Sequence, residues 1–216
     1  MWTRLIAGVT AHEINNLAHG LLGLLALAEN PDNMPGVLPR YAAQAEERLR
    51  ALQALARDLG VLARCGHAAL PGGHALDLAC SDALTEIDVT EGKSVEVVDL
   101  PAGVNVGGSP DALRTAIRAL LGYCLAASPP GARVRLAARL DPDIVVVTLD
   151  APQALPLAVT EAAPLAEARA APELRADFGV VLAGALATEL GGELRVGPGA
   201  GGGIRFALGV PRAAPG

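Results

Sequence analysis

The stretch Ala11-His12-Glu13-Ile14-Asn15-Asn16 lies inside a mostly apolar run from Trp2 to Asn30 that contains no proline. Apolar residues recur along this run at spacings of mostly three and four, which is typical of an amphipathic α-helix: Ile6, Val9, Leu17, Leu21, Leu24 and Ala28. We therefore predict a single helix, roughly 40 Å long at ~1.5 Å per residue. Further leucines widen its apolar surface beyond what one partner helix can cover: Leu22, Leu25 and Leu27.

A second helix is predicted from about Pro39 to Cys65, after a turn at 30–36 that contains two prolines and a glycine. Its apolar residues gather on one face: Tyr41, Ala45, Leu49, Leu52, Leu55, Leu59 and Leu62. Two helices of matched length with a short connection form an antiparallel hairpin, and two such hairpins from two chains form a four-helix bundle that buries the surplus leucine. The sequence therefore predicts a homodimer.

The pattern changes after a segment at 66–74 that contains Pro71-Gly72-Gly73 and is predicted to be a linker. The expected elements begin with a short strand or extended segment at 75–79, a helix at 81–88 capped by Ser81, a strand at 94–100 and a helix from Ser109-Pro110 to 127. Strands at 133–140 and 144–150 should form a hairpin, followed by a helix at 177–190 and a closing hairpin of strands at 193–196 and 204–210. This order predicts an α/β sandwich with its helices on one face of the sheet. The fold class is therefore α+β, with a helical domain at 1–68 and a sandwich domain at 75–216.

Composition excludes several classes of function. The chain has 51% hydrophobic residues, enough for a core, and a net charge of −6, which gives no electrostatic basis for binding nucleic acid. The longest apolar run, 17–28, is interrupted by His19 and falls short of the ~20 residues that cross a bilayer. Three widely spaced cysteines, Cys65, Cys80 and Cys124, have no metal-ligand pattern and are typical of reduced thiols. We expect a cytoplasmic protein with no membrane span and no metal site.

The central stretch places chemistry on the first helix. His12 and Asn16 are one turn apart on the same face, and Glu13 lies about 100° round the axis from His12. The pattern resembles the phosphoacceptor box of sensor histidine kinases. That resemblance implies that His12 accepts a phosphoryl group, Glu13 assists proton movement, and Asn16 helps to hydrolyse a partner's aspartyl phosphate. His19, seven residues after His12, is the weaker candidate acceptor because no carboxylate follows it.

The resemblance to histidine kinases continues through the second half of the chain. The residues that carry it are Lys93-Ser94-Val95-Glu96-Val97 with Leu100-Pro101, then Ser109-Pro110-Asp111-Ala112-Leu113-Arg114, then Leu190-Gly191-Gly192-Glu193-Leu194, and finally the segment from Ile204 to Pro211. They are similar, in this order, to the entry and the closing strands of the family's Bergerat-type ATP-binding domain. The resemblance implies that residues 75–216 have that fold.

The nucleotide-binding residues of the family are mostly missing. Two asparagines expected one turn apart, one of them a Mg²⁺ ligand, are replaced by Ala119 and Tyr123. The Asp-x-Gly-x-Gly box keeps only Asp150, since both glycines are lost. The Gly-x-Gly before the last helix becomes Asp177-Phe178-Gly179, which puts a carboxylate where a triphosphate would lie. We expect a vestigial pocket that binds no ATP.

Together these features resemble a histidine phosphotransfer protein derived from a histidine kinase. Such a protein takes a phosphoryl group from one response-regulator receiver domain on His12 and passes it to another. It needs no cofactor of its own, because Mg²⁺ belongs to the receiver. Three alternatives stay open: a histidine kinase with weak or altered nucleotide binding, a receiver phosphatase that uses Glu13 and Asn16, and a pseudokinase scaffold without chemistry. The usual proline after the second asparagine is replaced by Leu17, so the first helix should run straight.

Overall fold

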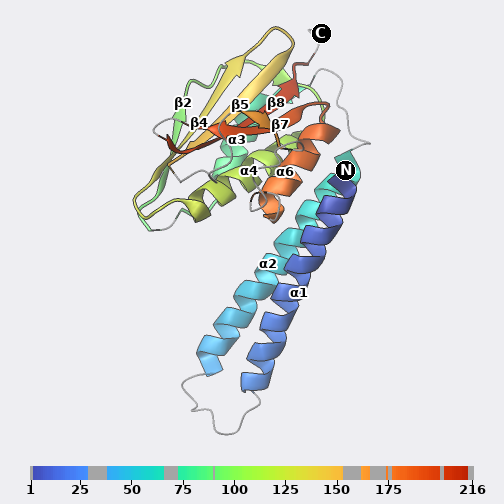
Figure 1. The fold of residues 1–216 in the computed structure, drawn as a ribbon, viewed down its shortest axis with the longest axis vertical. Helices are drawn as coiled ribbons and strands as arrows, with labels where there is room; N and C mark the ends of the chain where they lie inside the picture. Colours follow the sequence, from blue (N-terminus) through green and yellow to red (C-terminus); the bar gives the residue numbers. More distant parts are fainter. Residues whose placement is uncertain are drawn as a thin grey trace.

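The computed structural model describes residues 2–28, 38–65, 73–89, 91–152, 162–165, 174, 177–199 and 202–213. Two long helices form a hairpin that projects from an α/β layer, and the chain termini lie at the α/β end (Figure 1). The predicted combination of a helical hairpin and a mixed α/β layer is confirmed. The predicted linker lies mostly outside the described residues.

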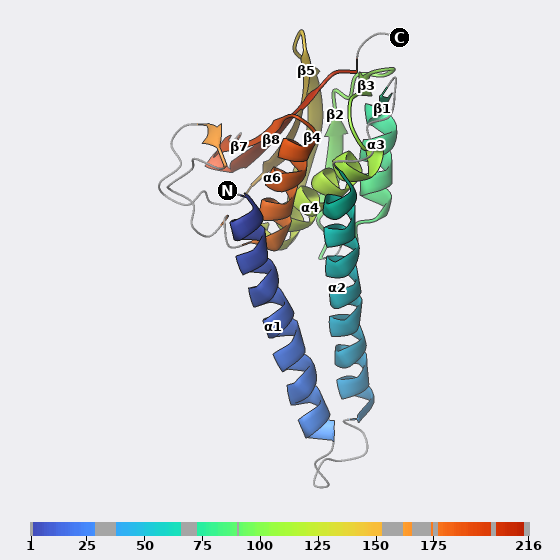
Figure 2. The ribbon, with the colours of Figure 1, turned by 90° about the vertical axis from the view of Figure 1, so that its right-hand side faces the viewer.

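The hairpin consists of α1 (Trp2–Ala28) and α2 (Leu38–Arg64), each 27 residues long. Leu17 and Leu24 of α1 and Leu55 of α2 are buried, as the helical period predicted. α1 is one unbroken helix through Leu17, as expected without a proline there. Towards the α/β layer the two helices diverge, so that α1 reaches α6 (Phe178–Glu189) and α2 runs towards α4 (Pro110–Ala127) (Figure 2).

The α/β layer is built on a six-stranded sheet in the order β2-β4-β5-β8-β7-β6. Its strands are β2 (Ser94–Val98), β4 (Arg133–Leu140), β5 (Ile144–Ala151), β6 (Ala163–Pro164), β7 (Glu193–Pro198) and β8 (Ile204–Pro211). All neighbours pair antiparallel except β2 and β4, which are parallel. β1 (His74–Ala75) and β3 (Asn105–Val106) form a separate two-stranded sheet beside α3 (Leu76–Thr85). The sequence pattern missed β3 and β6 because two residues are too few to show a period, whereas β1 contains Ala75, where a short strand or extended segment was expected to begin.

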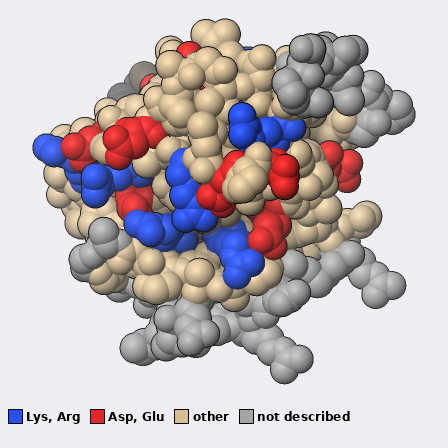
Figure 3. Space-filling model, turned by 90° about the horizontal axis from the view of Figure 1, so that it is seen from above, with Lys and Arg blue, Asp and Glu red and all other residues tan. Residues whose placement is uncertain are grey.

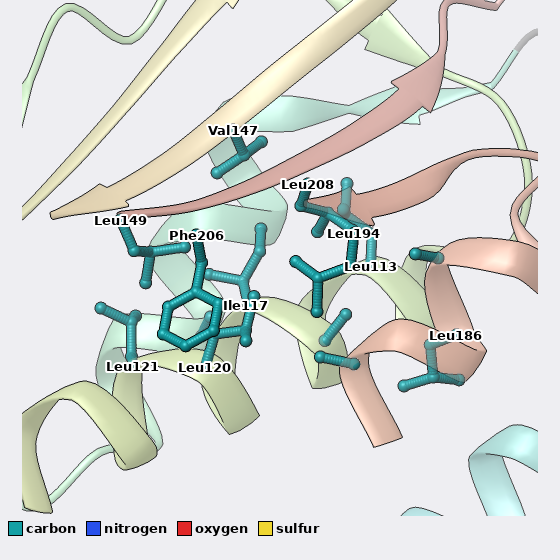
Figure 4. Packing of buried hydrophobic residues seen from close by; sticks show 14 of the residues in the cluster. Leu113, Ile117, Leu120, Leu121, Val147, Leu149, Leu186, Leu194, Phe206 and Leu208 are labelled. Carbon is teal, nitrogen blue, oxygen red and sulfur yellow. The ribbon is translucent and has the colours of Figure 1, made fainter. Parts of the chain in front are cut away.

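One face of the large sheet is covered by α4 and α6, and the core lies between them (Figure 4). Alternate strand residues point into it, and Phe206 and Leu149 are fully buried there against one face of α4. α4 begins where it was predicted, with Ser109 as its N-cap and Pro110 in its first turn, although the Ser109 hydroxyl makes no capping hydrogen bond.

One local prediction is wrong. We expected an extended segment at 75–79 and a helix capped by Ser81, but α3 already begins at Leu76 and Ser81 lies inside it. The reason is helical packing: Leu76, Ala79, Cys80 and Ala83 follow one another at spacings of three, one and three residues and are buried on one face of α3. The short apolar run is therefore the start of a helix. Periodicity over so few residues cannot distinguish a helix from an extended segment.

The outer end of the α/β layer carries charges of both signs, intermixed across the surface (Figure 3). Arginines of the sheet pair with nearby carboxylates, as in Arg133 and Arg135 with Glu96, Arg139 with Asp141, and Arg195 with Glu193. This face therefore lacks the single-sign field that attracts nucleic acid. Among the described residues, none of the helices has the length and hydropathy needed to cross a bilayer.

Two side-chain contacts illustrate how the hairpin is joined to the α/β layer, where Val61 of α2 also belongs to the core. Trp2 of α1 packs on α6 at Gly184, where a Cβ atom would overlap the indole. Arg118 of α4 pairs with Asp58 of α2 and also lies 3.3 Å from Glu86. Asp58 is only 8% exposed, so this pair is shielded from water more than an ordinary surface ion pair. Both contacts lie at the same end of the hairpin and hold it against the helical face of the layer.

Gly184→Ala should displace Trp2 from α6. The added methyl group has no free space beside the indole, and overpacking of this kind typically costs ~1–3 kcal/mol of unfolding free energy. Trp2 is the only tryptophan in the chain, so its fluorescence emission should shift to longer wavelength as the ring enters water. Gly122→Ala in α4 is the control, because no atom lies within 4 Å of its added Cβ. An unchanged emission spectrum for Gly184→Ala would contradict this packing.

Candidate functional site

The structure brings His12 and Asn16 together on the surface of α1. Both side chains are exposed, and the Asn16 amide Nδ2 lies 3.1 Å from His12 Nε2. In this orientation of the amide, Nδ2 donates to Nε2, which corresponds to the imidazole tautomer that carries its proton on Nδ1. The hydrogen bond from Asn16 therefore favours the tautomer in which Nε2 carries a lone pair. Rotation of the amide would release that nitrogen to attack an electrophile from solvent.

Glu13 does not contact the His12 ring through a hydrogen bond. Its carboxylate is partly buried and, in the part of the chain that the structure describes, has neither a hydrogen-bond nor an ion-pair partner. Glu13 is thus an unpaired carboxylate, in the described structure, one residue from His12. The residue that contacts the ring is Asn16, and its spacing of four residues from His12 was the signal in the sequence for this contact.

His12 lies on a different side of α1 from the apolar row that includes the exposed residues Ile14 and Leu25. A heptad-spaced row runs along the helix through Ala7, Ala11, Ile14, Ala18, Leu21 and Leu25. At 100° per residue, the His12–Asn16 edge is about 140–180° away from the centre of that row. A partner that covers the apolar row would therefore leave His12 in water. His19 is also exposed, and remains the alternative acceptor.

The residues expected at the vestigial pocket do gather in space. Ala119 of α4 lies against the start of α6: a Cβ atom at Gly179 would stand 3.2 Å from the Ala119 carbonyl oxygen and 3.3 Å from Asp177 Oδ1. One turn along α4, the ring of Tyr123 packs edge-on against Phe206, with 5.6 Å between centroids. The two helices thus approach closely where the family resemblance places magnesium and triphosphate.

Asp150 is held by a cross-strand ion pair. It lies opposite Arg205 in the register of β5 and β8, and the guanidinium donates to both carboxylate oxygens, Nε to Oδ1 at 2.7 Å and Nη2 to Oδ2 at 2.8 Å. This hydrogen bond raises the pKa of Arg205. Both oxygens of Asp150, the carboxylate that the family resemblance assigns to adenine binding, therefore already accept hydrogen bonds from Arg205. Sequence reasoning missed Arg205, because β5 and β8 are distant in the chain and only the sheet order makes them neighbours.

Asp177 serves as the N-cap of α6. Its Oδ1 accepts a hydrogen bond of 2.9 Å from the backbone amide of Val180. Burial raises the pKa of Asp177, against the opposing effect of the backbone amides of Val180 and Gly179. The carboxylate thus occupies the helix N-terminus, where backbone amides would otherwise bind an anionic ligand.

The described residues contain no cluster of three or more His, Cys, Asp or Glu side chains that could hold a metal ion. Buried thiols offer no alternative site. Burial raises the pKa of Cys80 to about 12, and it raises the pKa of Cys124 as well, so both stay protonated near neutral pH.

No protein-family model and no curated protein sequence matches this chain. Its fold is nevertheless found among solved structures. The Acinetobacter baumannii histidine kinase AdeS is 12% identical with a TM-score of 0.64, and the match covers 94% of this chain and 96% of that one. A mycobacterial sensor histidine kinase, MprB, is 17% identical with a TM-score of 0.51 over 66% of this chain and 97% of that one.

The full-length ShkA structure, solved in complex with AMPPNP, is 19% identical with a TM-score of 0.58. That match covers 97% of this chain but 46% of ShkA. Since the AdeS and ShkA matches span nearly the whole chain, the hairpin and the α/β layer together have a histidine kinase fold. At sequence identities of 12–19%, the similarity establishes the fold alone.

Asp177→Asn should leave the stability of the protein unchanged or raise it at pH 7. Asparagine caps a helix as well as aspartate, and it removes a charge whose burial opposes ionisation. Because the folded-state pKa of Asp177 is raised, the cost of its charge is present above that pKa. It disappears as the pH falls towards the unfolded value near ~3.9, so the two proteins should converge in acid. Urea unfolding at several pH values measures the difference.

Asp177→Ala is the comparison for that experiment. Alanine loses the cap as well as the charge, and should cost ~1 kcal/mol of unfolding free energy. If the asparagine variant is destabilised as much as the alanine variant, the capping role assigned to this side chain is wrong.

Proposed function

We propose that this chain is a histidine phosphotransfer protein of a two-component phosphorelay. In this proposal it accepts a phosphoryl group on His12 from the aspartate of a response-regulator receiver domain and passes it to another receiver. The observation that carries the proposal is the exposed imidazole of His12, held by Asn16 with its lone pair on Nε2, on the helical hairpin of a histidine kinase fold.

The transfer uses groups that the chain provides. Nε2 of His12 attacks the phosphorus of the receiver's aspartyl phosphate, the N–P bond forms, and the P–O bond to the aspartate breaks so that its carboxylate leaves. The proton on Nδ1 stays on the ring, which becomes positively charged. The Glu13 carboxylate, which follows His12 in the sequence, can stabilise that charge or take the proton. The reverse sequence delivers the group to the next receiver, and any Mg²⁺ involved is held by the receiver's own carboxylates.

The state of the ancestral nucleotide site supports a function without ATP. Asp150 is bound at both oxygens by Arg205, and Asp177 caps the helix at which a triphosphate would bind. Ala119 supplies no oxygen ligand from its side chain, and the ring of Tyr123 packs on Phe206. Each residue is thus engaged in holding the α/β layer together. A protein of this kind would obtain its phosphoryl group from another protein.

A homodimer is part of this proposal. The row on α1 is matched on α2 by a second heptad-spaced row: Ala45, Leu49, Leu52, Ala56, Leu59 and Ala63. Ile14, Leu25 and Leu49 are 41%, 56% and 51% exposed in the single chain. Between the diverging ends of α1 and α2, an apolar groove of about 560 Å³ is bordered by Ile14, Leu59 and Ala185 of α6. A second hairpin would cover these surfaces and complete a four-helix bundle.

The central experiment offers the protein two phosphoryl donors in parallel. A labelled, phosphorylated receiver domain should label the wild-type chain, and the label should be lost in acid and kept in alkali, as phosphohistidine is. Labelled ATP should transfer nothing. His12→Ala should abolish labelling without changing the unfolding transition, whereas His19→Ala should be labelled normally.

Other outcomes of the same experiment favour the alternatives. Label transferred from ATP would favour a kinase. Loss of phosphate from the receiver without label on His12 would favour a phosphatase that uses Glu13 and Asn16. Receiver binding that survives His12→Ala, with no label in either protein, would favour a scaffold.

Leu25→Glu should convert the dimer into monomers, because it places one charge from each chain in an apolar seam. Sedimentation or light scattering at several protein concentrations measures the mass. Leu78→Glu is the matched control, since Leu78 of α3 is 63% exposed and lies outside both heptad rows. A wild-type chain that is monomeric at high micromolar concentration, or a Leu25→Glu variant that stays dimeric, would refute the proposed bundle.

A further inference from the structure

A second groove lies between α1 and α2, and the heptad rows do not account for it. It has a volume of about 380 Å³ and is lined by Leu17, Gln44, Glu47, Arg48 and Ala51. From the helical angles, the α2 residues Gln44, Glu47 and Ala51 lie about 100° or more from the centre of the heptad row on that helix. The groove therefore opens on the opposite side of the hairpin and stays accessible when a second hairpin covers the seam.

Arg48 is held in this groove against Gly20 of α1. A Cβ atom at Gly20 would stand 2.5 Å from Cζ and Nη1 of Arg48, so the guanidinium occupies the space that any side chain would take. A glycine inside a helix costs ~1 kcal/mol relative to alanine, a cost that packing of this kind can offset. The arginine is thereby positioned by the backbone of the helix that carries His12.

The Arg48 guanidinium has no acceptor of its own. It is partly buried, yet no hydrogen bond or ion pair joins it to any residue in the described ranges, including its neighbour Glu47. Eight other arginines of the described chain pair with carboxylates: Arg50, Arg114, Arg118, Arg133, Arg135, Arg139, Arg195 and Arg205. A partly buried guanidinium without an acceptor in the described chain is a strong donor for a planar carboxylate, which a partner can supply.

Arg48 lies within the footprint of any protein that reaches His12. His12, Asn16 and Gly20 follow one another at intervals of four residues, so Gly20 is about 12 Å along the axis from His12 and on a neighbouring edge of α1. A specific interface covers about 800 Å² on each partner, a patch roughly 30 Å across. A receiver domain that presents its aspartyl phosphate to Nε2 would therefore also cover Arg48.

We propose that Arg48, held against Gly20, is a docking residue that binds a surface carboxylate of the receiver domain. This inference rests on the proposed phosphotransfer function. The phosphoryl group itself is too far away to be the acceptor, since it is delivered to His12 two turns along α1. The charge also fits the partner, because a domain that binds Mg²⁺ beside its phosphorylated aspartate does so with carboxylates and is acidic on that face.

The test separates docking from chemistry with two phosphoryl donors. The first is a phosphorylated receiver domain that labels the wild-type protein, at varied concentration. The second is phosphoramidate, a small donor that can reach His12 without docking. Arg48→Gln should raise the KM for the receiver about tenfold or more, which is the loss expected for a charged hydrogen bond, and should leave kcat and phosphoramidate labelling within about twofold. Its KM should also depend less on salt than that of the wild-type protein.

Two further variants complete the design. Gly20→Ala should raise the KM in the same way, because the new methyl group displaces the guanidinium without removing its charge. Arg57→Gln is the matched control: Arg57 is an exposed α2 arginine without an ion pair in the described structure and does not line the groove.

The outcomes are distinguishable. Equal KM values for Arg48→Gln and Arg57→Gln would overturn the docking role and leave the proposed function standing. A loss of phosphoramidate labelling in Arg48→Gln would also overturn it, because the residue would then act on His12 itself. A wild-type protein that neither donor labels would overturn the proposed function and this inference together.

Discussion

The helix α1 has three sides with different surroundings, and the arrangement of the hairpin depends on keeping them apart. One side of α1 packs on α2 through Leu17 and Leu24. A second side carries an apolar row whose residues are exposed or only partly buried in the described part of the chain, and a third carries the exposed residues His12 and Asn16. A helix can separate three such faces because 100° per residue distributes them around its axis. The imidazole of His12 can therefore be exposed on a helix whose other sides are available for packing.

The α/β layer has a fold similar to histidine kinase ATPase domains, and side chains at the positions expected to form its nucleotide site take part in packing. The Asp150 carboxylate, the Asp177 carboxylate and the Tyr123 ring each have a partner within the layer. Polar groups that would otherwise be stranded in an empty pocket are thereby satisfied, which matters because an unpaired buried carboxylate is costly. Each of these three side chains therefore contributes to the packing of the layer through an internal partner.

The junction between the two parts explains why the layer has been kept. Trp2 of α1 packs into the space over Gly184, and Asp58 of α2 pairs with Arg118, so both helices of the hairpin rest on the helical face of the layer at the same end. A two-helix hairpin of this length has little core of its own, and its ends would fray without support. The layer supplies that support at the α/β end, close to the half of α1 that carries His12.

The sequence by itself determined the elements with a long period and the chemistry of adjacent residues: both hairpin helices, α4 with its Ser109-Pro110 start, the two strand hairpins, and the His12–Asn16 spacing. These depend on local periodicity and local backbone rules, which can be read from neighbouring positions. Only the tertiary structure decided that α3 begins at Leu76, that Arg205 occupies Asp150, and that Arg48 lies against Gly20. Those outcomes depend on which distant segments become neighbours, and that is set by the packing of the whole chain.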